Sequence, residues 1–117
     1  MITDSTKKPN RYQIYINGQW TSSTNQEVIE VENPANEEVV ATIPAGSKDD
    51  AQRALEAAQA AQPAWEALPA IERAKLIIRL AELVDTDRDN LAHLIVSEQG
   101  KPLDQAYGEV DATIQFL

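Results

Sequence analysis

The sequence predicts an α+β fold, with a small antiparallel β-sheet over about residues 12–43 and four α-helices after it. In the first third of the chain, apolar residues alternate with polar ones, and Asn-Gly and Asn-Pro pairs separate the runs. This alternation is typical of strands. From about residue 47 the apolar spacing changes to three and four residues, which indicates amphipathic helices. We place these helices at about 47–62, 70–84, 88–98 and 102–117.

The predicted sheet begins with a hairpin. Residues 1–11 are polar and are interpreted as a flexible lead-in. In the run "YQIYINGQWT" that follows, the Asn17–Gly18 pair separates strands at about 12–16 and 19–22. Both residues tolerate the positive φ that a type I′ hairpin turn requires, so this pair is a strong hairpin signal.

Two further strands complete the predicted sheet. The run "VIEV" ends at the Asn33–Pro34 turn, and "EEVVATIPAG" supplies a strand at about 38–43. The connection between them is short, so we expect the two strands to pair in antiparallel orientation.

Each predicted helix has a start or stop signal. Ser47 and Asp50 form a capping-box-like start for the first helix, and Pro63 is expected to end it. The second helix is apolar on most of its circumference, which predicts burial on more than one side. The third helix stops at Gly100, and Pro102 opens the fourth.

The fourth helix keeps its apolar pattern to the end of the sequence, "ATIQFL", with no Gly, Lys or Arg in the last turn. Helices usually end with Lys or Arg in the last turn and Gly just after it. We therefore expect this chain to be the front part of a longer protein.

Composition excludes several classes of function. The chain has 117 residues and a formal net charge of −9, which argues against a nucleic acid or an anionic membrane as partner. It contains no cysteine, so it has no disulfide, thiolate zinc site or cysteine nucleophile of its own. No apolar run has the length of a signal peptide core or a spanning helix, and we expect a cytoplasmic location.

Gly100–Lys101 raises the question of a phosphate-binding loop. A Walker loop needs a glycine five positions before the Gly-Lys pair and a Ser or Thr after the lysine. This chain has Ile95 and Pro102 at those positions, and proline removes a backbone donor. The pair is better explained as the end of one helix and the start of another.

Other candidate groups also favour structural roles. Asp85, Asp87 and Asp89 resemble the start of a calcium loop, but its sixth and twelfth positions are Asn90 and Val96 rather than Gly and Glu. The single histidine has no partner nucleophile or ligand nearby in sequence, and is interpreted as a helix-surface residue. The adjacent carboxylates at 37–38 and 49–50 are interpreted as solvated turn and cap residues.

Glu109 is the one carboxylate left open. It lies beside the apolar positions Ala106, Tyr107 and Val110 of a helix that is expected to be buried. A partly buried glutamate needs a compensating partner, either a cation or backbone amides, and structural satisfaction is the favoured role.

Several motifs occur in an order that resembles a known family. From about residue 12 to the end, the chain is similar to the N-terminal part of the NAD(P)-dependent aldehyde dehydrogenase superfamily. The stretch "AQPAWEALPAIERA" is similar to the lactaldehyde/glycolaldehyde dehydrogenase branch. The ordered anchors are Asn33–Pro34, Ile43–Pro44–Ala45–Gly46, the Ala-rich helix, Trp65, Ile71–Glu72–Arg73 and Gly100–Lys101–Pro102.

The resemblance implies a fragment of an α/β enzyme. Residues 12–117 would be the N-terminal part of its cofactor-binding domain, truncated at the C-terminus. The whole enzyme would oxidise an aldehyde to a carboxylic acid with NAD or NADP. Its nucleophilic cysteine, base, oxyanion-hole asparagine and cofactor-binding lysine lie downstream, so no catalytic or cofactor-binding residue is assigned here. Some family members bind a structural monovalent cation, which would use the Glu32 carbonyl and the Glu109 carboxylate.

On this reading the chain alone would be an inactive scaffold that binds no cofactor, and its exposed apolar helix faces would favour self-association. The alternative is a stand-alone, non-enzymatic helical module that docks onto a partner.

Overall fold

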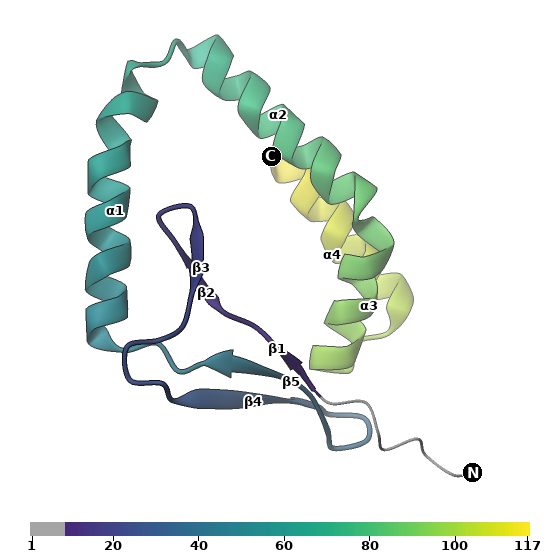
Figure 1. Cartoon of the computed structure of the whole chain (residues 1–117). Coiled ribbons are helices and arrows are strands. Elements are labelled where there is room, and N and C mark those ends of the chain that lie inside the picture. Colours follow the sequence, from purple (N-terminus) through teal and green to yellow (C-terminus); the bar gives the residue numbers. More distant parts are fainter. Residues whose placement is uncertain (1–8) are drawn as a thin grey trace. The chain divides into compact units, whose positions relative to one another are not determined.

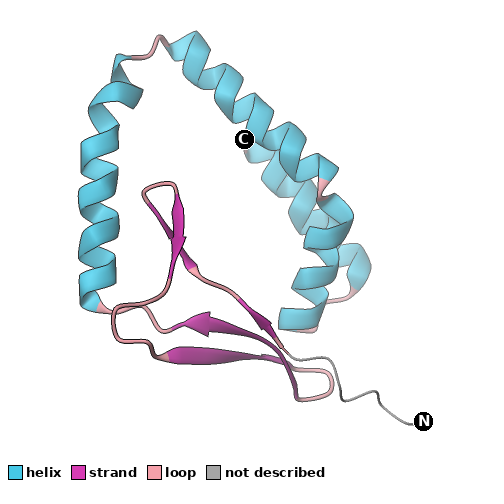
Figure 2. Cartoon of the chain, viewed as in Figure 1, coloured by secondary structure: helices cyan, strands magenta, loops and turns pink. Residues whose placement is uncertain are grey.

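The computed structural model describes residues 9–117, which form two compact units. The first unit extends to Ala57 and contains the strands, and the second runs from Ala58 to Leu117 and is helical. Figure 1 labels the elements along the chain, and Figure 2 separates helices from strands by colour. The order of strands followed by four helices confirms the predicted fold class.

The hairpin at the start of the first unit is confirmed. Strands β2 (Ile14–Ile16) and β3 (Gln19–Thr21) pair in antiparallel orientation around Asn17 and Gly18. These two residues have φ values of 52° and 76°, as a type I′ turn requires. Across the hairpin the rings of Tyr15 and Trp20 lie 5.0 Å apart, in the tilted geometry that aromatic pairs prefer.

The second predicted pair is also confirmed. Strands β4 (Val28–Asn33) and β5 (Glu38–Pro44) are antiparallel, with a bulge between Val31 and Glu32. The turn between them depends on Asn33, whose side-chain oxygen accepts a hydrogen bond from the amide of Ala35 at 2.9 Å. Such Asx turns are the physical reason that asparagine starts a turn.

Two details of the sheet differ from the prediction. Strand β1 (Asn10–Arg11) pairs in parallel with β5, inside the segment that was interpreted as lead-in. Residues 1–8 of that lead-in lie outside the described residues. The strands also form two sheets rather than one, β1-β5-β4 and β2-β3. A two-residue strand is too short to show alternation, so only the tertiary pairing reveals it.

Helix α1 (Lys48–Ala67) begins where predicted but continues past Pro63, so the predicted end at about residue 62 is wrong. Proline inside a helix removes one backbone hydrogen bond. The surrounding residues are rich in alanine, which has the highest helix propensity, and the helix tolerates the loss. It ends instead before Pro69, which precedes the first residue of the next helix.

The second unit is built from helices α2 (Ala70–Thr86), α3 (Arg88–Gln99) and α4 (Leu103–Phe116). Helix α4 packs against both α2 and α3 (Figure 1). The core of this unit is Ala92, Ala106 and Val110, with larger apolar side chains packed around it. Ala92 and Ala106 are fully buried, and their small side chains allow the helices to approach closely.

Gly100 separates α3 from α4 in a left-handed conformation, with φ 69° and ψ 17°. Its amide donates to the carbonyl oxygen of Val96 at 2.9 Å, which satisfies one of the last carbonyls of α3. Pro102 then precedes the first residue of α4. The predicted helix stop and restart is therefore confirmed.

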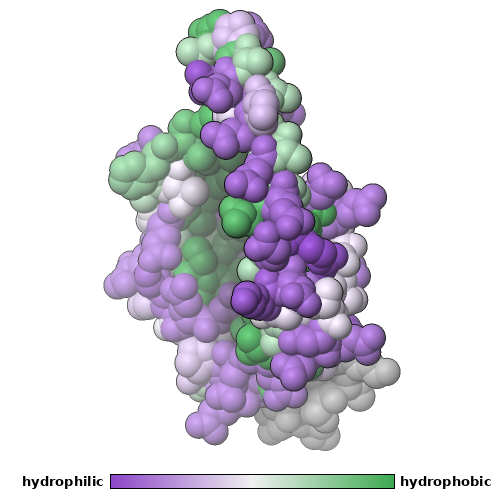
Figure 3. Space-filling view, turned by 90° about the vertical axis from the view of Figure 1, so that its left-hand side faces the viewer, coloured by the Kyte–Doolittle hydropathy of each residue, from purple (hydrophilic) through white to green (hydrophobic). Residues whose placement is uncertain are grey.

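Much apolar surface in the second unit is exposed. On α2, Ile71 is 63% exposed, and Leu76, Ile78 and Leu83 are each at least half exposed. The expectation that α2 is buried on several sides is therefore not met within the described residues. Figure 3 shows hydrophobic surface, in green, among hydrophilic residues on one face of the molecule. None of the helices described has both the length and the hydropathy to span a membrane.

We predict that Gly100→Ala destabilises the chain, because a β-carbon in the left-handed region costs about 1–2 kcal/mol. The matched control is Gly108→Ala, because Gly108 lies in α4 and an added β-carbon there meets no atom within 4 Å. That control should stabilise the chain by about 1 kcal/mol, the helix-propensity difference. Urea unfolding followed by circular dichroism measures both. Equal stability of Gly100→Ala and wild type would contradict the role of Gly100.

Candidate functional site

In the first unit, the carboxylate of Asp50, in the first turn of α1, is the centre of a network of hydrogen bonds. It is only 3% exposed. Its Oδ2 atom accepts hydrogen bonds from the Ser23 hydroxyl at 2.5 Å and from the Ser47 amide at 2.9 Å. Its Oδ1 atom accepts from the Arg53 guanidinium at 2.6 Å. The network ties the segment after β3 to the start of α1.

These contacts lower the pKa of Asp50 far below its ordinary value. The hydrogen bond from Ser23 is the largest cause, followed by the backbone amide of Ser47, while burial acts in the opposite direction. The carboxylate is therefore ionised in the folded chain, and its role is to hold two segments together.

The sequence identified only half of this network. The Ser47-x-x-Asp50 spacing predicted the reciprocal capping bonds, and the amide of Asp50 does donate to the Ser47 hydroxyl at 3.1 Å. Asp50 was nevertheless expected to be solvated, and that expectation is wrong because Ser23 covers it. Local spacing contains no signal for a partner that far away in sequence.

The predicted site residue Glu109 has its own cationic partner. The Lys101 ammonium donates to its Oε1 atom, so an ion pair links the segment before α4 to the second turn of that helix. Lys101 also belonged to the rejected phosphate loop, and this contact gives its side chain a structural role.

Glu32 lies on β4, beside the bulge, with an exposed side chain. It belongs to the first unit, whereas Glu109 belongs to the second. Within residues 9–117, no cluster of three or more His, Cys, Asp or Glu side chains has a metal-binding arrangement. The cation site stays a prediction.

The acidic run after α2 also has local roles. Asp87 accepts a hydrogen bond from the Asn90 side chain at 3.3 Å. Asp89 accepts one from the Tyr107 hydroxyl at 3.0 Å, and this bond raises the pKa of Tyr107. Asp85 and His93 have exposed side chains. His93 lies on α3, as predicted for a helix-surface residue.

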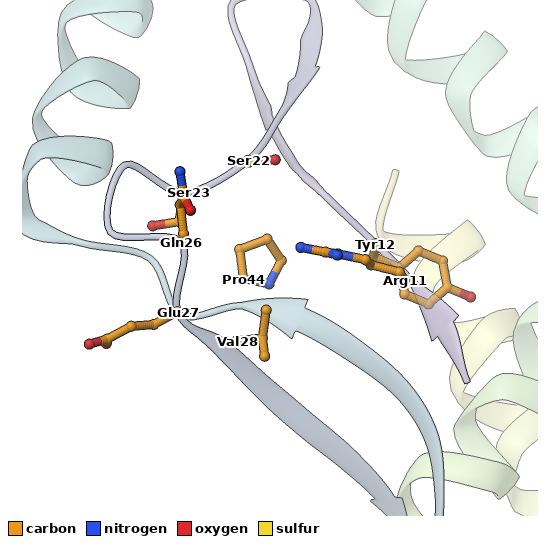
Figure 4. A pocket seen from close by; sticks show the side chains of 8 residues that line it. All are labelled: Arg11, Tyr12, Ser22, Ser23, Gln26, Glu27, Val28 and Pro44. Carbon is orange, nitrogen blue, oxygen red and sulfur yellow. The ribbon is translucent and has the colours of Figure 1, made fainter. Parts of the chain in front are cut away.

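A shallow pocket in the first unit was not predicted. It lies among β1, the segment after β3 and the facing ends of β4 and β5 (Figure 4). The Arg11 side chain extends toward the hollow, whereas the Glu27 side chain points away from it (Figure 4). The Ser23 hydroxyl at its edge is bonded to Asp50. The side chains that line this pocket include no nucleophile–base pair. Arg11 was missed because it fell in the predicted lead-in.

The described residues therefore present the Asp50 hydrogen-bond network, the Lys101–Glu109 ion pair and the pocket of Figure 4, none of which pairs a nucleophile with a base. Residues 20–117 match the sequence profile described as "Aldehyde dehydrogenase family". The chain belongs to the aldehyde dehydrogenase family. The resemblance recognised from its motifs is confirmed.

The relatives include enzymes for several aldehydes. The 3,6-anhydro-α-L-galactose dehydrogenase of Vibrio sp. (strain EJY3) is 46% identical over 107 residues, which cover 92% of this chain and 22% of that protein. The crystal structure of lactaldehyde dehydrogenase from Escherichia coli matches with a TM-score of 0.89 and 39% identity, over 93% of this chain and 23% of that one.

A third relative was solved with a bound cofactor. A point mutant of betaine aldehyde dehydrogenase from Staphylococcus aureus, in complex with NAD+, matches with a TM-score of 0.81 and 35% identity. The match covers 85% of this chain and 20% of that one. The chain thus spans about a fifth of the length of these aldehyde dehydrogenases and corresponds to their N-terminal portion.

We predict that Asp50→Asn destabilises the chain more than Asp49→Asn. Both residues lie in the first turn of α1, but only Asp50 is buried. The removed charge near the helix dipole is the same in both variants, so the difference isolates the network. Denaturant unfolding at neutral pH measures this difference in stability. Equal unfolding midpoints for the two variants would contradict the stabilising role of the Asp50 network.

The stabilisation by Asp50 should depend on pH. Its pKa is lowered by folding, so its contribution is complete above the ordinary value of 3.8 and is lost as the pH falls toward the folded-state pKa. The stability gap between wild type and Asp50→Asn should therefore shrink below that pH. A gap that stays constant down to about pH 2 would contradict this assignment.

Proposed function

We propose that this chain is the N-terminal scaffold of an NAD(P)-dependent aldehyde dehydrogenase, an oxidoreductase that converts an aldehyde to a carboxylic acid. The observation that supports this proposal is the family match over residues 20–117, together with a covered length of only 22% in the most similar relative described above.

The chain does not supply the chemistry of that reaction. Aldehyde oxidation through a covalent intermediate needs a thiolate nucleophile, and this sequence contains no cysteine. The hydride acceptor would be NAD or NADP, held by the remainder of the polypeptide. The complex of the Staphylococcus aureus relative with NAD+ supports a nicotinamide cofactor for the whole enzyme.

The role proposed for residues 12–117 is to form the N-terminal part of the cofactor-binding domain. The exposed apolar residues of α2 support this role, because a helix that shows leucine and isoleucine on several sides normally packs against other elements. Without those elements the same surface would favour self-association. We also propose a cytoplasmic location for the whole enzyme.

We predict that the purified chain neither binds NAD or NADP nor turns over an aldehyde. Calorimetric titration with each cofactor measures binding, and absorbance of the reduced nicotinamide measures turnover with lactaldehyde or a semialdehyde. Measurable turnover by the chain alone would overturn the scaffold assignment.

A positive test uses complementation. The part of the Vibrio enzyme that follows its matched region is produced separately and mixed with the chain, with NAD or NADP and 3,6-anhydro-α-L-galactose present. If the chain is the missing scaffold, the mixture should turn over substrate when neither part does so alone. The control replaces this chain with the Vibrio enzyme's own N-terminal part. Activity with that part but not with this chain would count against the proposal.

A further inference from the structure

Among the described side chains that line the pocket of Figure 4, Arg11 is the only cation. The sheet register explains its position. Arg11 pairs with Thr42 in β5, and Thr42 pairs with Glu30 in β4, so the three side chains lie on one face of the sheet. Val28 and Pro44 are partners two positions further along, on the same face. The Arg11 side chain extends across this face toward the hollow (Figure 4).

The charge of Arg11 is not compensated by the carboxylates around it. Within residues 9–117 its guanidinium takes part in no ion pair. Glu27 lines the pocket, but its side chain points away from the hollow (Figure 4). Glu30 shares the face of the sheet but does not line the pocket. Asp50 lies beyond the Ser23 hydroxyl and is bonded to it. The guanidinium therefore faces a hollow in which no described carboxylate binds it.

The rest of the lining combines hydrogen-bond donors with apolar surface. Ser22 carries a hydroxyl group and Gln26 a carboxamide, and both groups can donate. The Ser23 hydroxyl already donates within the Asp50 network. Val28 and Pro44 supply the apolar surface, and Val28 is 50% exposed. The pocket has a volume of about 210 Å³, which is smaller than typical sites for drug-sized ligands and suits a small molecule.

We propose that this pocket binds a small aliphatic carboxylate. The planar Arg11 guanidinium presents paired N–H donors that match the two oxygens of a carboxylate. The hydrocarbon part of the ligand lies on Val28 and Pro44, and Ser22 or Gln26 donates a further hydrogen bond. A phosphate would also match the guanidinium, but it has no apolar part to cover the other side of the pocket.

The formal net charge of −9 does not prevent this binding. At physiological ionic strength, charges further away than about 8 Å are largely screened, so the groups beside the ligand decide its affinity. The ligand is held by direct contact with an exposed arginine, and we therefore expect a dissociation constant in the millimolar range. The proposal concerns the first unit and does not depend on the proposed function.

The binding test titrates the isotopically labelled 117-residue chain with butyrate, acetate or phosphate, and chloride keeps the ionic strength constant. Butyrate should shift the amide NMR signals of Ser22, Gln26 and Val28 until they saturate. Acetate should bind at least about fivefold more weakly, because it buries fewer methylene groups. The absence of saturable shifts at these amides would overturn the proposal. Tighter binding of phosphate than of butyrate would overturn the assignment to an aliphatic carboxylate.

Arginine variants test the guanidinium contact. Arg11→Gln should weaken butyrate binding at least about tenfold, because it removes the charge. Arg11→Lys keeps the charge but lacks the planar pair of donors, and should weaken binding about threefold. The matched control is Arg79→Gln, because Arg79 is also exposed but lies on α2 and outside the pocket. That control should bind as wild type does. Unchanged affinity in both Arg11 variants would overturn the proposal.

Two neighbouring residues of β4 test the apolar contact. Val28 and Ile29 are 50% and 51% exposed, but successive side chains of a strand point to opposite faces, and only Val28 lines the pocket. Val28→Thr should weaken butyrate binding about threefold and leave acetate binding unchanged. Ile29→Thr should change neither. Equal effects of the two substitutions on butyrate binding would overturn the placement of the ligand's hydrocarbon part.

Discussion

The main physical constraint on this structure is that its own strands and helices cover only a small part of their apolar surface. Within the described residues the buried hydrophobic side chains are Ala41, Ala92, Ala106 and Val110, and none of them is large. Leucine and isoleucine side chains on α2 stay at least partly exposed at the same time. Because burial of apolar area is the main favourable term in folding, this imbalance supports the proposal that the chain completes its core against further polypeptide.

Polar contacts join segments that the small apolar core does not hold together. In the first unit the buried Asp50 carboxylate joins two segments that are far apart in sequence. In the second unit Arg88–Asp111 joins α3 to α4, and Lys101–Glu109 joins the segment before α4 to that helix. A charged group tolerates burial only when its hydrogen bonds are satisfied, so the Asp50 network fixes one arrangement of its segments. The described contacts of these groups are structural, in keeping with a scaffold.

Sequence reasoning succeeded wherever the signal was local. Asn17–Gly18 predicted the hairpin because both residues tolerate positive φ, and Gly100 predicted the end of α3 for the same reason. It failed where a distant contact or a balance of propensities decided the outcome. The pairing of Asn10–Arg11 with β5, the continuation of α1 through Pro63 and the burial of Asp50 are examples. Glu109, one of the two predicted cation-site residues, pairs with Lys101, a partner that apolar periodicity does not reveal.

The sequence by itself determined the order of strands and helices, the absence of a cysteine nucleophile and, through its ordered motifs, the family. These properties depend on residue identity and near-neighbour spacing, which are legible along the chain. Only the tertiary structure decided that Ser23 covers Asp50 and that both apolar and acidic side chains line a hollow between α2 and α4. Both features depend on which side chains meet across elements, and that is set by packing in three dimensions rather than by local pattern.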